Sequence, residues 1–263
     1  MRLKKQKIIE LAFPTLALVL ALLAWEFVVW FEAIPPFILP APSLILETLV
    51  TDWGTLYGSL LVTLRITFEA LVVAVLGGVA LAMLFAQSRI IERAFFPFAV
   101  IMQVTPVIAI APLLLIYLSA NTAVLVCAFL VAFFPILSNT ALGLASADHN
   151  LLDLFQLYGA SRAQQLAWLR VPSALPYFLG GLRIGGGLAL IGAIVAEIAA
   201  GSAGSGAGLA YRIVESGFRL KIPRMFAALL LISLTGILIY LVLTAVSYLL
   251  LRRWHDSARG REA

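Results

Sequence analysis

Residues 94–147 read AFFPFAVIMQVTPVIAIAPLLLIYLSANTAVLVCAFLVAFFPILSNTALGLASA, and no Asp, Glu, Lys or Arg occurs among them. A helix needs about 20 predominantly apolar residues to cross the hydrocarbon core of a bilayer. The stretch is therefore too long for one crossing, and the short polar segment SAN at residues 119–121 interrupts it. We predict two membrane-spanning helices, at about residues 94–118 and 122–147.

The composition of the whole chain supports a membrane protein. Of its 263 residues, 63% are hydrophobic and only 12% are charged, whereas soluble domains carry about 25% charged residues. A soluble protein needs charge on its water-facing surface, so we exclude a soluble globular fold. The lone cysteine, Cys127, can form no internal disulfide and does not report on the redox compartment.

Four further apolar stretches predict spans, at about residues 11–31, 60–86, 173–200 and 225–251. The first follows a basic N-terminus, but it is too long for a signal peptide and no small-x-small cleavage site follows it. We therefore predict an all-α integral membrane protein with six transmembrane helices, organised as a single domain over residues 1–263.

The distribution of Lys and Arg predicts the orientation, because these residues are retained on the cytoplasmic side of a membrane. With the N-terminus inside, most of them fall on the inner segments. We predict that both termini are cytoplasmic. This bias also accounts for the net charge of +5 without any nucleic acid partner.

Two connections are longer than a turn requires. The segment 32–58 contains four prolines and predicts a short amphipathic helix from Ser43 to about Asp52, with Ser43 as its N-cap. The segment 148–172 is polar and is predicted to be cytoplasmic. Connections between bundled helices commonly take 2–8 residues, so this segment has room for a task beyond joining two spans.

Local signals predict two short helices within the segment 148–172. Gly159 permits a tight turn between them, and Asp153 lies near the start of the first, where a carboxylate favours the helix dipole. The second helix is SRAQQLAWLR at 161–170, and its apolar side comprises Leu166, Trp168 and Leu169. Pro172 then marks the re-entry of the chain into the membrane.

Residues 153–172 read DLFQLYGASRAQQLAWLRVP, whose acid, glycine and closing proline resemble the EAA loop of ABC importer permeases. Other segments resemble the sulfonate, taurine and nitrate permeases of that family: LPAPSLIL at 39–46, FFPILSNT at 133–140, LPYFLGGLRI at 175–184 and VAE at 195–197. The stretches LYGASR and GGLALIGAIVAE are closer to permeases for thiamine or riboflavin precursors. The chain is thus identified as a member of the type I ABC importer permeases.

The resemblance implies a transmembrane subunit of the bacterial inner membrane that moves a small solute and is not an enzyme. Its implied partners are a second copy of the permease, two ATP-binding subunits and an extracytoplasmic binding protein. ATP and Mg²⁺ would bind to the ATP-binding subunits, since this chain has no G-x-x-x-x-G-K-[ST] motif. Its sequence also shows no His, Cys and carboxylate cluster spaced for a metal.

The implied solute is a sulfonate- or nitrate-like anion or another small compound containing nitrogen or sulfur. A neutral heterocycle, such as a thiamine or riboflavin precursor, is the alternative within the same class. A membrane-embedded enzyme or scaffold without a transport role is the alternative from a different class.

The resemblance also assigns residues that would contact or couple to the ATPase: Asp153, Leu154, Phe155, Gly159, Ala160, Ser161, Arg162, Leu169 and Pro172. Leu154 and Phe155 replace the small alanines of the EAA pattern, and Asp153 replaces its glutamate. We therefore expect the chain to pair with its own ATPase and to fit a foreign one poorly.

Polar residues in the predicted spans are candidates for the translocation path, because such residues are costly there and usually functional or paired. The candidates are Arg65, Gln103, Thr105, Asn139 and Glu197. Arg65 and Glu69 can instead neutralise each other across one helical turn, and Glu197 can bond a neighbouring helix or face a second copy. We expect Arg183 to snorkel or to cap carbonyls of the 148–172 segment, about two turns from the inner surface.

Two more groups of residues have an expected role. The glycines of the fifth span, which include a G-x-x-x-G pattern, predict close helix packing; they are Gly180, Gly181, Gly185, Gly186 and Gly187. The last outer loop would receive the binding protein through Tyr211, Arg212, Arg219 and Lys221. Its basic surface suits an acidic docking face or an anionic solute equally well.

Overall fold

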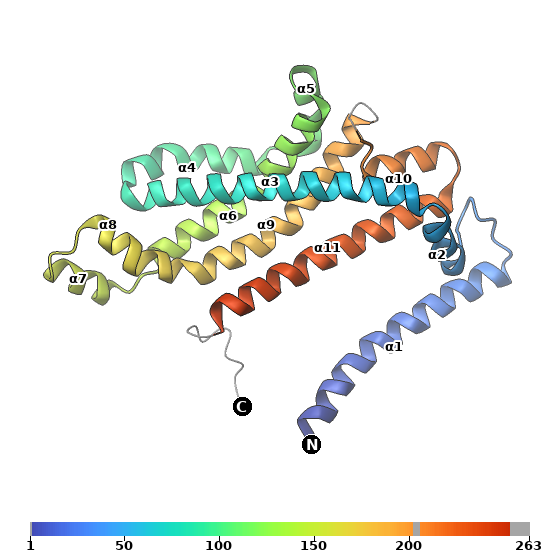
Figure 1. The fold of residues 1–263 in the computed structure, drawn as a ribbon, viewed down its shortest axis with the longest axis horizontal. Coiled ribbons are helices and arrows are strands. Elements are labelled where there is room, and N and C mark those ends of the chain that lie inside the picture. Colours follow the sequence, from blue (N-terminus) through green and yellow to red (C-terminus); the bar gives the residue numbers. More distant parts are fainter. Residues whose placement is uncertain (1, 202–205, 253–263) are drawn as a thin grey trace.

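A computed structural model describes residues 2–201 and 206–252, with side chains described from residue 12 onward (Figure 1). All regular structure within these ranges is helical. The helices are α1 (Arg2–Phe31), α2 (Pro42–Thr51), α3 (Trp53–Gln87), α4 (Arg89–Val104), α5 (Val107–Tyr117), α6 (Ala120–Ala145), α7 (His149–Leu157), α8 (Arg162–Gln165), a π-helical turn (Leu166–Arg170), α9 (Val171–Ala200), α10 (Leu209–Phe218) and α11 (Ile222–Leu251).

Five helical segments in the described part of the chain are long and apolar enough to cross a membrane. They are Ala12–Phe31 of α1, α3, α6, the continuous segment Arg162–Ala200 that ends in α9, and α11. The all-α membrane fold is therefore confirmed. Short helices lie at both ends of the bundle, with α7 and α8 at one end and α2 and α10 at the other (Figure 1). We call these the α7 end and the α10 end.

The span predicted at residues 94–118 is instead a pair of helices, α4 and α5, that meet at an angle of 99°. The bend falls at Thr105 and Pro106. Proline has no N–H to continue the bonding of α4, and it forces the preceding residue out of the helical region; Thr105 accordingly has φ −73° and ψ 122°. The count of six spans holds if the pair is one broken span, but a straight helix over 94–118 is wrong.

The segment boundaries elsewhere follow the expected signals with one correction. The break at 119–121 is confirmed, since Ser119 caps α6 by accepting a hydrogen bond from the Thr122 N–H at 3.3 Å. The helix predicted from Ser43 exists as α2, but its N-cap is Ala41. Ser43 instead binds α1, because its N–H and hydroxyl both donate to the Glu26 carboxylate, at 3.0 and 2.6 Å.

Helix α1 is attached to the rest of the chain near one end. Besides the Glu26 contact, Trp25 packs against Phe226 of α11 with ring centroids 5.9 Å apart. Towards the N-terminus α1 diverges from α11 (Figure 1), and its side chains from residue 12 to 24 are exposed. Such an apolar, uncovered helix fits a hydrocarbon environment.

Close packing of α6 on α9 forms the centre of the bundle, with α3 lying against α6. A Cβ on Gly181 would lie 2.8 Å from the Pro135 carbonyl oxygen, and one on Gly185 would lie 2.9 Å from the Ile136 side chain. Gly186 leaves equally little room beside Leu243 of α11. Small residues let helix backbones approach in this way.

The prediction of close packing is therefore confirmed at Gly181, Gly185 and Gly186. It is wrong for Gly180 and Gly187, where a Cβ would meet no described atom within 4 Å. These two glycines lie on a side of α9 that points away from α6 and α11.

The neighbouring positions 180 and 181 provide a matched test of this contact. Gly181→Ala should destabilise the folded chain by about 1–3 kcal/mol, because the Pro135 backbone cannot yield to an added methyl group. Gly180→Ala should be neutral or stabilise by about 0.5–1 kcal/mol, since alanine is the better helix former. Thermal unfolding of both variants in detergent would measure the difference, and equal midpoints would contradict this account of the interface.

Candidate functional site

The α7 end carries the 148–172 segment, whose first helix begins at Asp148. The Asp148 carboxylate accepts a hydrogen bond from the Asn150 N–H at 2.8 Å and so caps α7. Asp153 lies in the middle of α7 and is exposed. The expectation that Asp153 serves the helix N-terminus is therefore wrong, because the chain supplies an acid one turn earlier.

Gly159 forms the predicted tight turn. Its φ is +72°, and its N–H donates to the Gln156 carbonyl while the Ala160 N–H donates to the Phe155 carbonyl, both at 2.9 Å. This pair of bonds is the Schellman motif, which satisfies the last carbonyls of a helix and prefers glycine at the left-handed position. A Cβ at Gly159 would meet no described atom within 4 Å, so it is the backbone angle that requires glycine.

Ser161 starts the next helix two residues later. Its hydroxyl accepts from the Gln164 N–H at 3.3 Å, and the Gln164 side chain accepts from the Ser161 N–H at 2.7 Å, which together form a capping box. From Arg162 the chain is helical through the π turn to Ala200. Pro172 lies inside this helical stretch, so the chain makes no turn there. The wider π turn lies directly before Pro172, where proline disturbs regular helical bonding.

The side chains of the π turn Leu166–Arg170 differ in whether they face the bundle. Leu166 packs on the central core and Leu169 is only 8% exposed, as predicted for an apolar side. Trp168 is 75% exposed, so its assignment to that side is wrong. Arg170 ties the turn to the end of α3, donating to the Ala86 carbonyl oxygen at 3.5 Å.

The projecting segment presents apolar side chains that no described part of the chain covers. Every residue of α7 is exposed or half-buried. We call the following set the α7–α8 apolar surface: Leu151, Leu154, Leu157, Tyr158 and Trp168, with exposed fractions of 44%, 46%, 85%, 82% and 75%.

The coupling candidates differ in their exposure. Most of them are accessible: Asp153, Leu154, Gly159, Ser161, Arg162 and Pro172 are exposed, whereas Phe155 and Ala160 are half-buried and Leu169 is buried.

At the α10 end, Glu197 is buried and satisfied by other helices. Its Oε1 accepts from the Thr63 hydroxyl of α3 at 2.8 Å, and its Oε2 accepts from the Ala210 N–H of α10 at 3.1 Å. Of the roles open from the sequence, bonding to neighbouring helices is the one that is seen. Sequence reasoning missed Thr63, which lies 134 positions away along the chain.

Glu197 forms part of the wall of a small pocket. The pocket lies where the ends of α3, α6 and α9 converge, and its lining comprises Val62, Ile66, Ala120, Asn121, Val124, Glu197, Ala200, Gly201, Gly206 and Gly208. Glu197 is the only ionisable residue in this lining.

The other path candidates make mostly local contacts. Arg65 pairs with Glu69 at 2.7 Å, which confirms the expected neutralisation. Thr105 donates to the Ile101 carbonyl, Asn139 donates to the Pro135 carbonyl, and Gln103 is exposed. Within the described residues no hydrogen bond joins any two of the five candidates, so they form no single polar cluster.

Arg183 lies more than three helical turns beyond Val171, the first residue of α9. Its guanidinium carbon is 6.0 Å from the centre of the Tyr240 ring of α11, and its Nε is buried without a hydrogen-bond partner in the described part of the chain. The expectation that Arg183 caps carbonyls of the 148–172 segment is therefore wrong.

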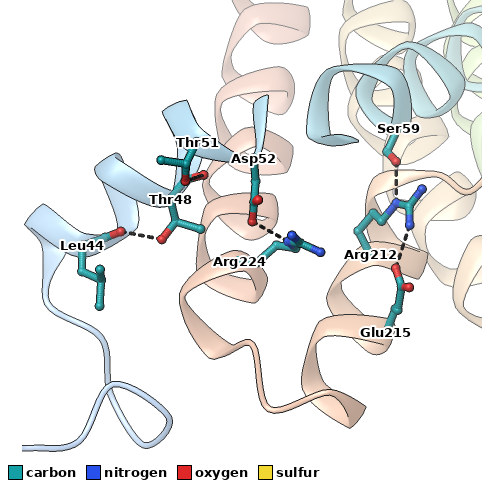
Figure 2. Close-up of polar contacts among 8 residues, drawn as sticks. All are labelled: Leu44, Thr48, Thr51, Asp52, Ser59, Arg212, Glu215 and Arg224. Atoms are coloured by element: carbon teal, nitrogen blue, oxygen red, sulfur yellow. Dashed lines mark hydrogen bonds and ion pairs between the residues drawn. The ribbon is translucent and has the colours of Figure 1, made fainter. Parts of the chain in front are cut away.

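Two separate sets of polar contacts lie at the α10 end: one joins α11 to the residue between α2 and α3, and the other joins α10 to α3 (Figure 2). Arg224 binds Asp52 at 2.5 Å, and Arg212 donates to Ser59 at 2.9 Å and to Glu215 at 2.7 Å. The Arg224 hydrogen bond lowers the pKa of Asp52, and the Arg212 hydrogen bond lowers the pKa of Glu215. These partnerships were not anticipated from the sequence.

The candidates for docking the binding protein lie at or near these contacts. Arg212 forms the contacts to Ser59 and Glu215, and its guanidinium carbon lies 5.8 Å from the centre of the half-buried Tyr211 ring. Arg219 pairs with Glu215 at 3.0 Å but remains 62% exposed, and Lys221 is exposed. Arg219 and Lys221 are therefore the accessible cations of the four candidates.

The Asp52–Arg224 pair gives a pH-dependent prediction. Because the folded-state pKa of Asp52 is lowered, its contribution is present above the unfolded-state pKa of about 3.9 and is lost as the pH falls through the folded-state value. Asp52→Asn should therefore destabilise the chain by about 1 kcal/mol at pH 7, and this effect should shrink as the pH falls below about 3.9. Asp153→Asn, which removes an exposed carboxylate, is the control. A constant effect of Asp52→Asn from pH 7 to pH 3 would contradict the assignment.

The chain is similar to known membrane components of transport systems. The family model described as binding-protein-dependent transport system inner membrane component matches residues 74–256. The formylaminopyrimidine transport permease protein ThiX of Halalkalibacterium halodurans is 33% identical over 243 residues, which cover 90% of this chain and 94% of that protein. The taurine transport system permease protein TauC of Escherichia coli is 29% identical over 259 residues, covering 95% and 92%.

A solved structure shares the fold. The crystal structure of an amino acid ABC transporter with histidines superposes with a TM-score of 0.62, covering 79% of this chain and 97% of that chain. At 20% sequence identity, this likeness concerns the fold alone.

Proposed function

This chain belongs to the family of binding-protein-dependent transport system inner membrane components and is an ABC importer permease; from this premise, we propose that its 148–172 segment binds the ATPase subunits. ATP and Mg²⁺ bind to those subunits, and this chain supplies the path for the solute. The proposal treats the segment as the EAA loop of the family and the chain as one permease domain.

The α7–α8 apolar surface is the observation that carries the proposal. A nine-residue helix with no buried side chain gains little from packing on the bundle, yet the Schellman turn at Gly159 and the capping box at Ser161 fix its course. Exposed apolar residues gathered on such an element are typical of a protein–protein contact. A partner that covers Leu154 and Leu157 would remove them from water.

Continuity of the helix beyond α8 supports a coupling role. From Arg162 to Ala200 the chain is one helical segment of 39 residues, and Arg170 ties its beginning to α3. A displacement of α7 by the partner would therefore act close to the start of α9, which is packed along α6 in the centre of the bundle. This is how ATP-driven movement of the partner would reach the spans.

The assembly that we propose contains two copies of this chain, two ATP-binding subunits and an extracytoplasmic binding protein in a bacterial inner membrane. The α7 end faces the cytoplasm, in keeping with the bias of Lys and Arg towards the predicted inner segments. The α10 end faces outward, where the exposed Arg219 and Lys221 are available to the binding protein.

Two solute classes are supported by different observations. Likeness to the taurine permease supports a small sulfonate-like anion. Likeness to the formylaminopyrimidine permease, with 33% against 29% identity, supports a neutral nitrogen heterocycle. A ligand screen on the matching binding protein distinguishes the two.

The ATPase contact is tested by replacing one exposed leucine. Leu154→Asp places a charge in the middle of the α7–α8 apolar surface and should reduce co-purification of the ATPase by at least about tenfold, since a buried unpaired charge costs several kcal/mol. Leu220→Asp, an equally simple change at an exposed leucine of the α10 end, is the control. Pull-down of the co-expressed ATPase from detergent extracts measures both. Retention of the ATPase by Leu154→Asp at the control level would refute the proposal.

A further inference from the structure

Helix α10 begins without a capping side chain of its own. Its N-cap is Gly208, and the first N–H groups of any helix lack partners within that helix. Here the Leu209 N–H donates to the Thr63 hydroxyl at 2.9 Å, and the Ala210 N–H donates to Glu197 Oε2 at 3.1 Å. The cap of α10 is therefore supplied by two other helices, α3 and α9.

The four groups form a closed and buried arrangement. The Thr63 hydroxyl accepts from Leu209 and donates to Glu197 Oε1 at 2.8 Å. Thr63, Leu209 and Ala210 are 0% exposed and Glu197 is 4% exposed. Polar groups at such depth are costly when unpaired, so separating α10 from α3 and α9 would break several bonds at once.

Gly208 shows how closely the carboxylate approaches the start of α10. A Cβ on Gly208 would collide with all three terminal atoms of the Glu197 side chain. The φ of Gly208 is −72°, which any residue can adopt. Space, and not backbone angle, therefore requires glycine at this position.

A second bond joins α10 to the same side of α3. Arg212 donates to the Ser59 hydroxyl at 2.9 Å (Figure 2), and Ser59 is 2% exposed, one helical turn before Thr63. The two bonds hold α10 along one face of α3, while Glu197 holds it to the end of α9. Any displacement of α10 is thereby imposed on both spans.

We propose that Ser59, Thr63 and Glu197 are positioning residues that together transmit docking of the binding protein from α10 to α3 and α9. This inference rests on the proposed function. The exposed side of α10 and the turn after it carry Phe218, Arg219 and Lys221, which the partner can contact from outside. The buried side carries the bonds to the spans, so α10 connects the outer surface to the helices that enclose the path.

The same helix offers a matched control. Thr67 is also buried, at 3% exposure, but its hydroxyl donates only to the carbonyl of Thr63 within α3. Thr63→Val and Thr67→Val are the same isosteric change one helical turn apart. Only the first removes the bonds to Glu197 and α10, and Thr63→Ser restores the hydroxyl.

The experiment measures ATP hydrolysis by the complete complex in nanodiscs, with and without saturating binding protein. Thr63→Val should lower the ratio of stimulated to basal hydrolysis by about fivefold or more, the smallest effect expected of an allosteric coupling. Thr67→Val and Thr63→Ser should keep the wild-type ratio. A loss of the same size in Thr67→Val, or a wild-type ratio in Thr63→Val, would overturn the inference.

A milder variant covers the case in which Thr63→Val does not assemble. Ser59→Ala removes the acceptor of Arg212 and leaves the buried cap intact, so it should lower the same ratio without changing basal hydrolysis. If Ser59→Ala lowers the melting temperature but leaves the ratio of stimulated to basal hydrolysis unchanged, the bonds between α10 and the spans have only a structural role. The inference then fails. If the wild-type chain binds no ATPase, the proposed function itself fails, which is a separate and recognisable result.

Discussion

Close contact between α6 and α9 is the interaction on which both ends of the structure depend. In hydrocarbon there is no hydrophobic force to drive helices together, so their association relies on close packing and on hydrogen bonds. Gly181 and Gly185 provide that approach against Pro135 and Ile136. Because α9 is fixed in this way along its length, the residues at its two ends have defined positions relative to α3 and α6.

The centre of the bundle could be predicted from sequence because it depends on length and charge alone. The spans expected at 122–147 and 173–200 correspond to Ala120–Ala145 and Val171–Ala200, since an uncharged run of this length has few other stable conformations in a membrane. The corner at Gly159 was predictable for a similar reason: its left-handed φ is a local property. The bend of α4 and α5 was not, because proline indicates a break but its angle depends on packing.

Polar partners that lie far apart along the chain could not be predicted from the sequence. Asp52 and Arg224 are 172 positions apart, and nothing in either neighbourhood indicates the other. Trp168 is a different case, because a regular helix turns by about 100° per residue and so places it about 200° from Leu166, away from the bundle. Its assignment to the apolar side rested on its hydrophobic character and not on the helical period, and its 75% exposure is what that period predicts.

The arrangement of α9 explains why one helix can serve two distant sites. The helical segment Arg162–Ala200 has 39 residues, which corresponds to about 58 Å at 1.5 Å per residue. One end adjoins the projecting α7, and the other carries Glu197, which is bonded to α3 and α10. A helix held by hydrogen bonds at one end and by backbone contact along its middle does not absorb a displacement locally. If the chain functions as we propose, a change imposed at either end would shift the packing of α9 against α6 at the glycine contact.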